Sequence, residues 1–115
     1  MCNGDSAPRL AMWSSKNPVT LLGADATKQG AEEVRRFFQV VASWSSNCTA
    51  YRFELVAAEV SGDLAYTVGL EHMSVSFRGG PVAPISLRVT HVYRRENGEW
   101  RIVHRHGDRL LGNQA

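Results

Sequence analysis

Apolar and polar residues alternate along most of the chain from Thr49 onward, in runs that turn-forming residues separate. Alternation with a period of two is typical of strands that bury one face of a sheet. The runs span residues 51–57, 64–77, 85–94 and 99–107, and Asn97-Gly98 between the last two is a strong hairpin signal. This pattern predicts an antiparallel meander of four strands.

The second run changes its parity. Its apolar residues pass from one alternating set to the other, namely from Leu64, Tyr66, Val68 and Leu70 to Met73, Val75 and Phe77. Such a change inside one long strand favours a β-bulge near residues 69–72, and therefore a bend in the sheet.

The first half of the chain is predicted to be helical. One apolar helix face is formed by Val34, Phe37, Phe38 and Val41. We expect this helix to run from about Gly30 to Ser45, opened by Thr27 or Gln29. A short strand at 19–22 and a short helix at 7–13, capped by Asp5, precede it. Residues 1–115 then form one α+β domain, a strongly curved antiparallel sheet wrapped on helices.

Composition narrows the function classes. The 115 residues carry a formal net charge of +2 and are 43% hydrophobic, which is ordinary for a globular domain. We expect no nucleic-acid partner from so small a charge, and no membrane partner because no apolar run approaches the ~18–20 residues of a membrane span. The N-terminus lacks signal-peptide features, and two widely spaced cysteines suit a cytoplasmic location. We found no cofactor motif and expect no cofactor.

The hairpin implies a register. With a type I′ turn at Asn97-Gly98, one face pairs Tyr93 with Ile102, His91 with His104, Val89 with His106, and Leu87 with Asp108. The other face carries Val92 opposite Val103, ringed by Arg88, Arg94, Arg101 and Arg105. This richness in arginine fits either a compositional bias or anion binding. We expect helices to cover the histidine face.

A shared face leaves three interpretations of His91, His104 and His106 open. In the first interpretation, the rings are structural, and each is buried and hydrogen-bonded to the backbone or to a carboxylate. Alternatively, they are catalytic, and serve as general acid, general base or hydrogen-bonding groups in a pocket. A third possibility is zinc bound by the three rings with one position left for water, but no acidic ligand is securely placed and we assign no metal site.

Four other side chains are candidate ligand-binding residues: Trp13, Tyr66, Glu71 and Asp108. Trp13 and Tyr66 also suit core packing. Glu71 and His72 form either a second polar cluster at the expected bulge or a solvated pair on an exposed bend. Asp108 joins the histidine face through the expected register.

Two segments carry a resemblance. They are Gly62-Asp63-Leu64-Ala65-Tyr66-Thr67-Val68-Gly69, and the hairpin from Arg88 through Asn97-Gly98-Glu99-Trp100 to Ile102-Val103-His104-Arg105-His106. They resemble the SnoaL-like, ketosteroid-isomerase-like branch of the nuclear transport factor 2-like superfamily. The last strand is also similar to that of the association domain of calcium/calmodulin-dependent kinase II. Upstream residues 3–5, 10–14 and 19–23 match the same pattern, so the resemblance covers nearly the whole chain.

The resemblance implies a cystatin-like α+β roll, a cone with a pocket at its open end and frequent dimers through the sheet. Members range from ketosteroid isomerases, cyclases and dehydratases to assembly domains, so the fold leaves function open. Because the matching pattern begins at Asn3-Gly4-Asp5, we expect the family's long first helix to be missing. Its isomerases place an Asp base where this chain reads Leu21-Leu22-Gly23-Ala24, with Asp25 displaced, so that activity is not carried over.

Two functions therefore remain. One is a small-molecule-binding SnoaL-like pocket protein, with isomerase-, cyclase- or hydratase-type chemistry by histidine on an apolar, oxygenated ligand. The alternative is a non-catalytic association module. In both cases we expect a homodimer through the outer sheet face, where an apolar centre with an arginine rim is typical of an interface.

Overall fold

Strands make up most of the protein. The computed structural model describes residues 11–23, 26–77 and 80–110. Its elements are β1 (Thr20–Leu22), β2 (Thr27–Gln29), α2 (Ala31–Trp44), β3 (Ser45–Ser61), β4 (Leu64–Phe77), β5 (Ala83–Glu96) and β6 (Glu99–Arg109). The expected helix and meander are confirmed, whereas β2 was not expected. The short helix predicted at 7–13 falls mostly outside the described residues.

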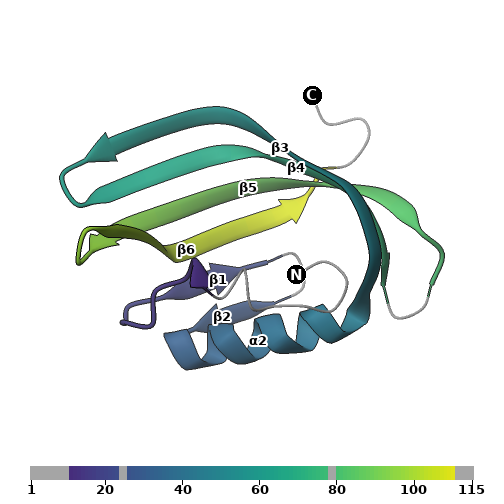
Figure 1. Ribbon diagram of the computed structural model, residues 1–115, viewed down its shortest axis with the longest axis horizontal. Coiled ribbons are helices and arrows are strands. Elements are labelled where there is room, and N and C mark those ends of the chain that lie inside the picture. The colour runs from purple at the N-terminus through teal and green to yellow at the C-terminus, as the bar shows by residue number, and fades with distance from the viewer. Residues whose placement is uncertain (1–10, 24–25, 78–79, 111–115) are drawn as a thin grey trace.

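The strands form one curved sheet in the order β2-β1-β6-β5-β4-β3 (Figure 1). Strands β3 to β6 are an antiparallel meander, and β1 joins its edge parallel to β6. The helix α2 packs near β1 and β2, at one side of the sheet. The fold is therefore α+β, as expected, with a mixed sheet of six strands. We call the sheet face that packs with α2 the inner face, and the opposite one the outer face.

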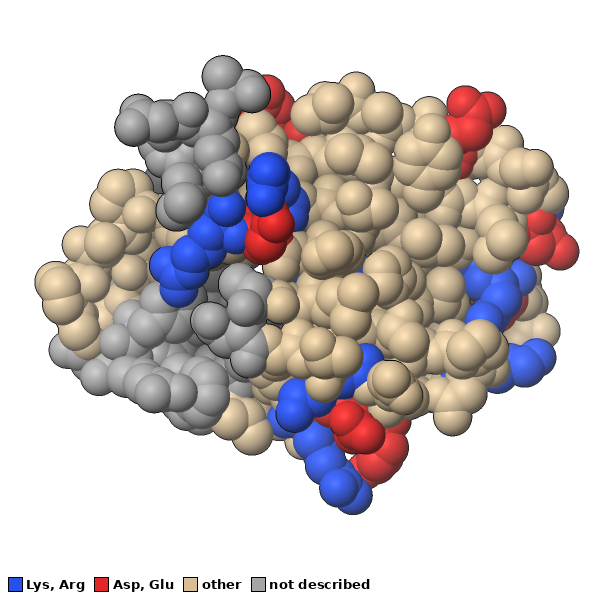
Figure 2. All heavy atoms as spheres, turned by 180° about the vertical axis from the view of Figure 1, so that it is seen from behind, with Lys and Arg blue, Asp and Glu red and all other residues tan. Residues whose placement is uncertain are grey.

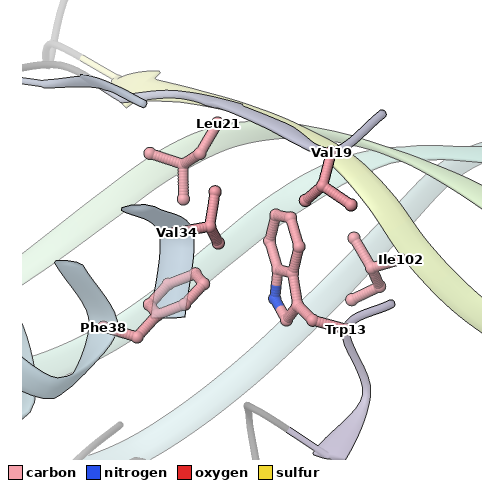
Figure 3. Packing of buried hydrophobic residues seen from close by; sticks show 6 residues of the cluster. All are labelled: Trp13, Val19, Leu21, Val34, Phe38 and Ile102. Atoms are coloured by element: carbon pink, nitrogen blue, oxygen red, sulfur yellow. The ribbon is translucent and has the colours of Figure 1, made fainter. Parts of the chain in front are cut away.

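The hydrophobic core lies between α2 and the inner face. Its buried side chains are Trp13, Val19, Leu21, Val34, Phe38 and Ile102 (Figure 3). The rings of Trp13 and Phe38 are tilted at 56°, with centroids 5.2 Å apart. Alternation along β1 explains why Leu21 points to this core while Thr20 does not, since neighbouring side chains of a strand take opposite faces. Removing these six residues from water stabilises this end of the sheet.

The start of α2 depends on a distant residue. Asn17 accepts a hydrogen bond at Oδ1 from the backbone N–H of Ala31, at 2.9 Å. Gly30, just before the helix, has a φ of 91°, a conformation that glycine adopts without strain. The expectation that Thr27 or Gln29 opens the helix is wrong, because both residues lie in β2.

The hairpin register holds only near its turn. Asn97 and Gly98 have φ values of 52° and 80°, as a type I′ turn requires, and Tyr93 pairs with Ile102 as expected. Beyond that pair the register shifts, because Val103 is an extra residue in β6. The expected partners of Leu87, Val89, His91 and Val92 are therefore wrong, and the observed ones are Arg109, Gly107, Arg105 and His104.

The bulge expected at residues 69–72 is also wrong. Strand β4 pairs with β5 without a break from Leu64 to Val75. The irregularities lie in β3 instead, between Leu55 and Ala57 and at two earlier positions. The parity change in β4 has another cause: its apolar residues up to Leu70 lie on the outer face, and Met73 and Val75 lie on the inner face.

Candidate active site on the inner face

A buried ion pair joins two strands of the inner face. Arg105 on β6 donates two hydrogen bonds to the carboxylate of Glu71 on β4, from Nη1 to Oε2 at 3.0 Å and from Nη2 to Oε1 at 2.9 Å. Glu71 is only 2% exposed. A two-pronged contact of this kind fixes both side chains, since guanidinium and carboxylate match in plane and spacing.

Two more side chains join this pair. Tyr51 donates its hydroxyl hydrogen to Glu71 Oε2, at 3.1 Å. Arg105 Nη1 lies 3.1 Å from Nε2 of His91, which is 7% exposed. Because a guanidinium has only donors, Nε2 must be the acceptor, and the ring proton of His91 then sits on Nδ1. We call Tyr51, Glu71, His91 and Arg105 the inner cluster.

The sheet positions this cluster through its register. Arg105 lies opposite His91, while Glu71 lies opposite Leu87, four residues before His91 in β5. The Arg105 side chain therefore runs along the inner face, past Val89, to reach Glu71. Gly107 leaves room for it, since a Cβ there would sit 3.4 Å from Nη2 of Arg105.

Apolar side chains extend the inner face beside the cluster. Tyr51 is 49% exposed, and Phe53 and Leu55 on the same strand are exposed too. The Phe53 ring lies on Gly69, where a Cβ would fall 2.4 Å from Cζ. A glycine at 69 is therefore required for the ring to lie flat on the sheet. The result is an accessible apolar surface that borders buried polar groups.

The three histidines do not share a face. His91 lies on the inner face, while His104 and His106 lie on the outer face, because Val103 inverts the alternation of β6. The expected cluster of three rings is wrong for this reason, and so is the zinc arrangement built on it. Within residues 11–23, 26–77 and 80–110, no group of three or more His, Cys, Asp or Glu could hold a metal ion. Whether any of these histidines is catalytic stays a prediction.

The other candidates are dispersed. Trp13 is a core residue that also borders a crevice of about 230 Å³ beside the start of α2. Tyr66 lies on the outer face, 41% exposed, and not on the apolar inner side as expected. Asp108 lies on the outer face and accepts two hydrogen bonds from Arg88, at 2.7 and 2.6 Å. Hydrogen bonding from Arg88, together with its charge, lowers the pKa of the Asp108 carboxyl.

Arg105 is the main residue that sequence reasoning missed. Strict alternation from the turn assigned it to the outer arginine rim, and that assignment is wrong. The sequence predicts a strand position for Tyr51 and no functional role. Glu71 carries a signal for such a partner, because a carboxylate at an inner position of a central strand needs a cationic side chain nearby.

Comparison with known protein families places this chain in one of them. A family model described as the SnoaL-like domain matches residues 2–108, and the chain belongs to this family. A comparison with curated proteins found no match.

Solved structures agree on the fold. A ketosteroid isomerase-like protein from Erwinia carotovora atroseptica superposes with a TM-score of 0.79 at 15% identity, covering 94% of this chain and 83% of its own. A putative dehydratase of the NTF2-like family from Streptomyces avermitilis gives 0.73 at 23% identity, covering 95% and 84%. A putative calcium/calmodulin-dependent protein kinase II association domain from Xanthomonas campestris gives 0.69 at 16% identity, covering 95% and 76%. The similarity to this superfamily expected from the sequence is confirmed.

Helices of membrane-spanning length and hydropathy do not occur in the part of the chain that the structure describes.

Proposed function

We propose that this protein binds a small, largely apolar molecule with an oxygen function on its inner face, and that His91 exchanges a proton with this ligand. The observation that carries the proposal is the inner cluster, in which the Glu71–Arg105 pair holds His91 in one tautomer. The proposal retains the histidine chemistry expected from the sequence but assigns it to one ring.

The burial of the ion pair supports a role beyond stability. Taking two charges out of water costs several kcal/mol per ion, and a pair of apolar residues of similar size is often as stable. Charges held in such a place are more easily understood if they orient a neighbouring group. Here Arg105 orients both Glu71 and His91. Imidazole is also the side chain best suited to proton exchange near neutral pH.

The surroundings suggest the ligand's chemistry. Tyr51, Phe53 and Leu55 offer exposed apolar area, while the guanidinium of Arg105, with its five N–H donors, can donate to an oxygen atom. Relatives named as ketosteroid isomerase-like or as a putative dehydratase favour the same ligand class. The isomerase reaction itself is not proposed, because residues 21–23 contain no carboxylate.

A binding screen tests this proposal. Cyclic ketones and aromatic carboxylates would be added to the wild-type protein, and the melting temperature and chemical-shift changes would be recorded. We expect one class to bind, with affinity reduced about tenfold or more by His91→Gln, the effect of losing about 1.4 kcal/mol of contact. Arg95→Gln, an exposed change on the same strand, is the matched control. Equal binding by His91→Gln and wild type would refute the role of His91.

A second candidate function is self-association, which a separate observation favours. Leu64 and Tyr66 on the outer face are 53% and 41% exposed, and Val92 lies beside Tyr66. We call these three residues the outer patch. From behind, the middle of the molecule is almost free of charged side chains, which gather around it (Figure 2). An exposed apolar surface of this kind often marks an interface.

The occupant that we propose for the outer patch is a second copy of the chain. Glu59 flanks the patch on β3 and Arg94 flanks it on β5. A two-fold axis running along the strands would place opposite charges against each other. Sedimentation at micromolar concentration should then give twice 12.7 kDa, and a persistent monomer would refute the dimer. The cytoplasmic location expected from the sequence also remains a proposal, which fluorescence of a tagged protein in cells would test.

A further inference from the structure

We propose a second reactive site, on the outer face, in which Ser86, His72 and Glu54 form a hydrolytic triad for esters. The three side chains come from β5, β4 and β3. The proposal is independent of the inner-face function, because alternation along each strand separates the two sets of residues.

The geometry is that of a hydrogen-bonded chain. His72 Nδ1 lies 2.8 Å from Ser86 Oγ, and His72 Nε2 lies 3.1 Å from Glu54 Oε1. His72 and Ser86 are direct cross-strand partners, which holds their side chains side by side. A nucleophile within reach of a base that a third group orients is the defining arrangement of triad chemistry.

The donors and acceptors assign the protons. A carboxylate only accepts, so Nε2 of His72 carries the hydrogen that it donates to Glu54. The neutral ring then presents an unprotonated Nδ1, which accepts the hydroxyl hydrogen of Ser86. With this arrangement of protons, the hydroxyl hydrogen of Ser86 points to Nδ1 of His72, which is the base. Triads more often use the two ring nitrogens the other way round, but either nitrogen can serve when the other donates to the carboxylate.

Two neighbours support the site. Arg52, the cross-strand partner of His72 on β3, places Nη1 3.8 Å from the same Oε1 of Glu54. A groove of about 310 Å³ lies next along the outer face, with Leu70, Val68 and Thr90 among its lining residues. Leu70 is two residues from His72, so an acyl chain in this groove would bring its carbonyl near Ser86.

The reaction balances with water as the only co-reactant. Ser86 Oγ forms a bond to the ester carbonyl carbon while its proton passes to His72 Nδ1. The bond from that carbon to the alcohol oxygen breaks, and the alcohol leaves with the proton from His72. Water then attacks the acyl-serine, gives a proton to His72, and releases the carboxylic acid while Ser86 regains its proton. We expect activated esters to react first, because their leaving groups need least assistance.

The test uses the full chain with p-nitrophenyl butyrate and a fluorophosphonate probe. Peptide mass spectrometry of the wild-type protein should find the phosphonyl adduct on Ser86. Ser86→Ala and His72→Gln should each lower the protein-dependent release of p-nitrophenol by about a hundredfold. Ser74→Ala, a serine on the same outer face of β4, should hydrolyse at the wild-type rate.

Glu54 is a positioning residue with its own test. Glu54→Gln should slow labelling of Ser86, and Glu54→Asp should restore part of it, at unchanged melting temperature. Absence of an adduct on Ser86 in the wild-type protein would overturn the proposal without any variant. Hydrolysis by Ser86→Ala at the wild-type rate would also overturn it, since an imidazole alone would then account for the reaction.

Discussion

The carboxylate of Glu71 depends on its partners more than any other described acidic group. It is buried, and it accepts hydrogen bonds from Arg105 and Tyr51. Glu71→Gln leaves the guanidinium of Arg105 buried without its counter-charge, and breaking such a pair from one side costs about 3–5 kcal/mol. Urea unfolding should show this loss. Asp63→Asn, which removes the carboxylate of an exposed pair with Arg95, should cost less than about 1 kcal/mol. Equal losses in the two variants would contradict this account.

His104 should give stability a pH dependence. Partial burial, and then the charge of nearby His106, lower the pKa of His104 below 6.5. The unfolded chain therefore binds this proton more readily than the folded protein. The free energy of unfolding should decrease as the pH falls through 6.5, and this contribution should level off below the folded-state pKa.

The measurement is urea unfolding between about pH 8 and pH 5. His104→Gln should flatten the dependence. The same slope in wild type and variant would show that another group is responsible.

At the scale of single residues, sequence reasoning named Glu71 and His91 but not their connection. Both lie on strands that pair without a break, so their shared face follows once the register between β4 and β5 is known. Arg105 lies beyond the extra residue Val103, and nothing in a two-residue turn reports a bulge further along the strand. Register inferred from a turn is reliable only up to the first irregularity.

Among the elements, α2 tests how far local patterns extend. Its bounds, Ala31–Trp44, lie within a residue of those expected, because the apolar spacing and the acidic first turn are local. Its cap is not local, since Asn17 precedes Ala31 by fourteen residues. No sequence rule for adjacent caps could have found it.

The cap gives a direct prediction for this element. Asn17→Ala leaves the N–H of Ala31 without its acceptor and should lower the free energy of unfolding by about 1 kcal/mol. Thr27→Ala removes the residue that the sequence suggested as a cap, and should have the smaller effect. Thermal unfolding followed by circular dichroism compares the two variants. A larger loss in Thr27→Ala would show that Asn17 does not stabilise the helix.

For the whole molecule, the meander and the helix were foreseeable, but the identity of the two sheet faces was not. Apolar residues occur on both faces of β4, so composition could not indicate which face packs with α2. The outer patch could therefore not be predicted from the sequence, because its definition depends on knowing which sheet face packs with α2.

Two independent faces predict separable effects. Tyr66→Glu places a charge in the outer patch and should convert a dimer to a monomer in sedimentation, while ligand binding at His91 persists. Val60→Glu is the matched control, because Val60 is apolar and even more exposed than Tyr66, at 61% against 41%, but lies on the inner face. Dissociation by both variants would mean that the outer patch is not specific.

The extra residue in β6 has an evolutionary consequence. If Val103 instead paired with Val92 in the ladder, all residues after it to the end of the strand would exchange faces. Arg105 would leave the inner face, and His104 and His106 would enter it. A relative of the same length that has lost this bulge could therefore present an entirely different set of reactive groups to its ligand while its sequence remained almost identical.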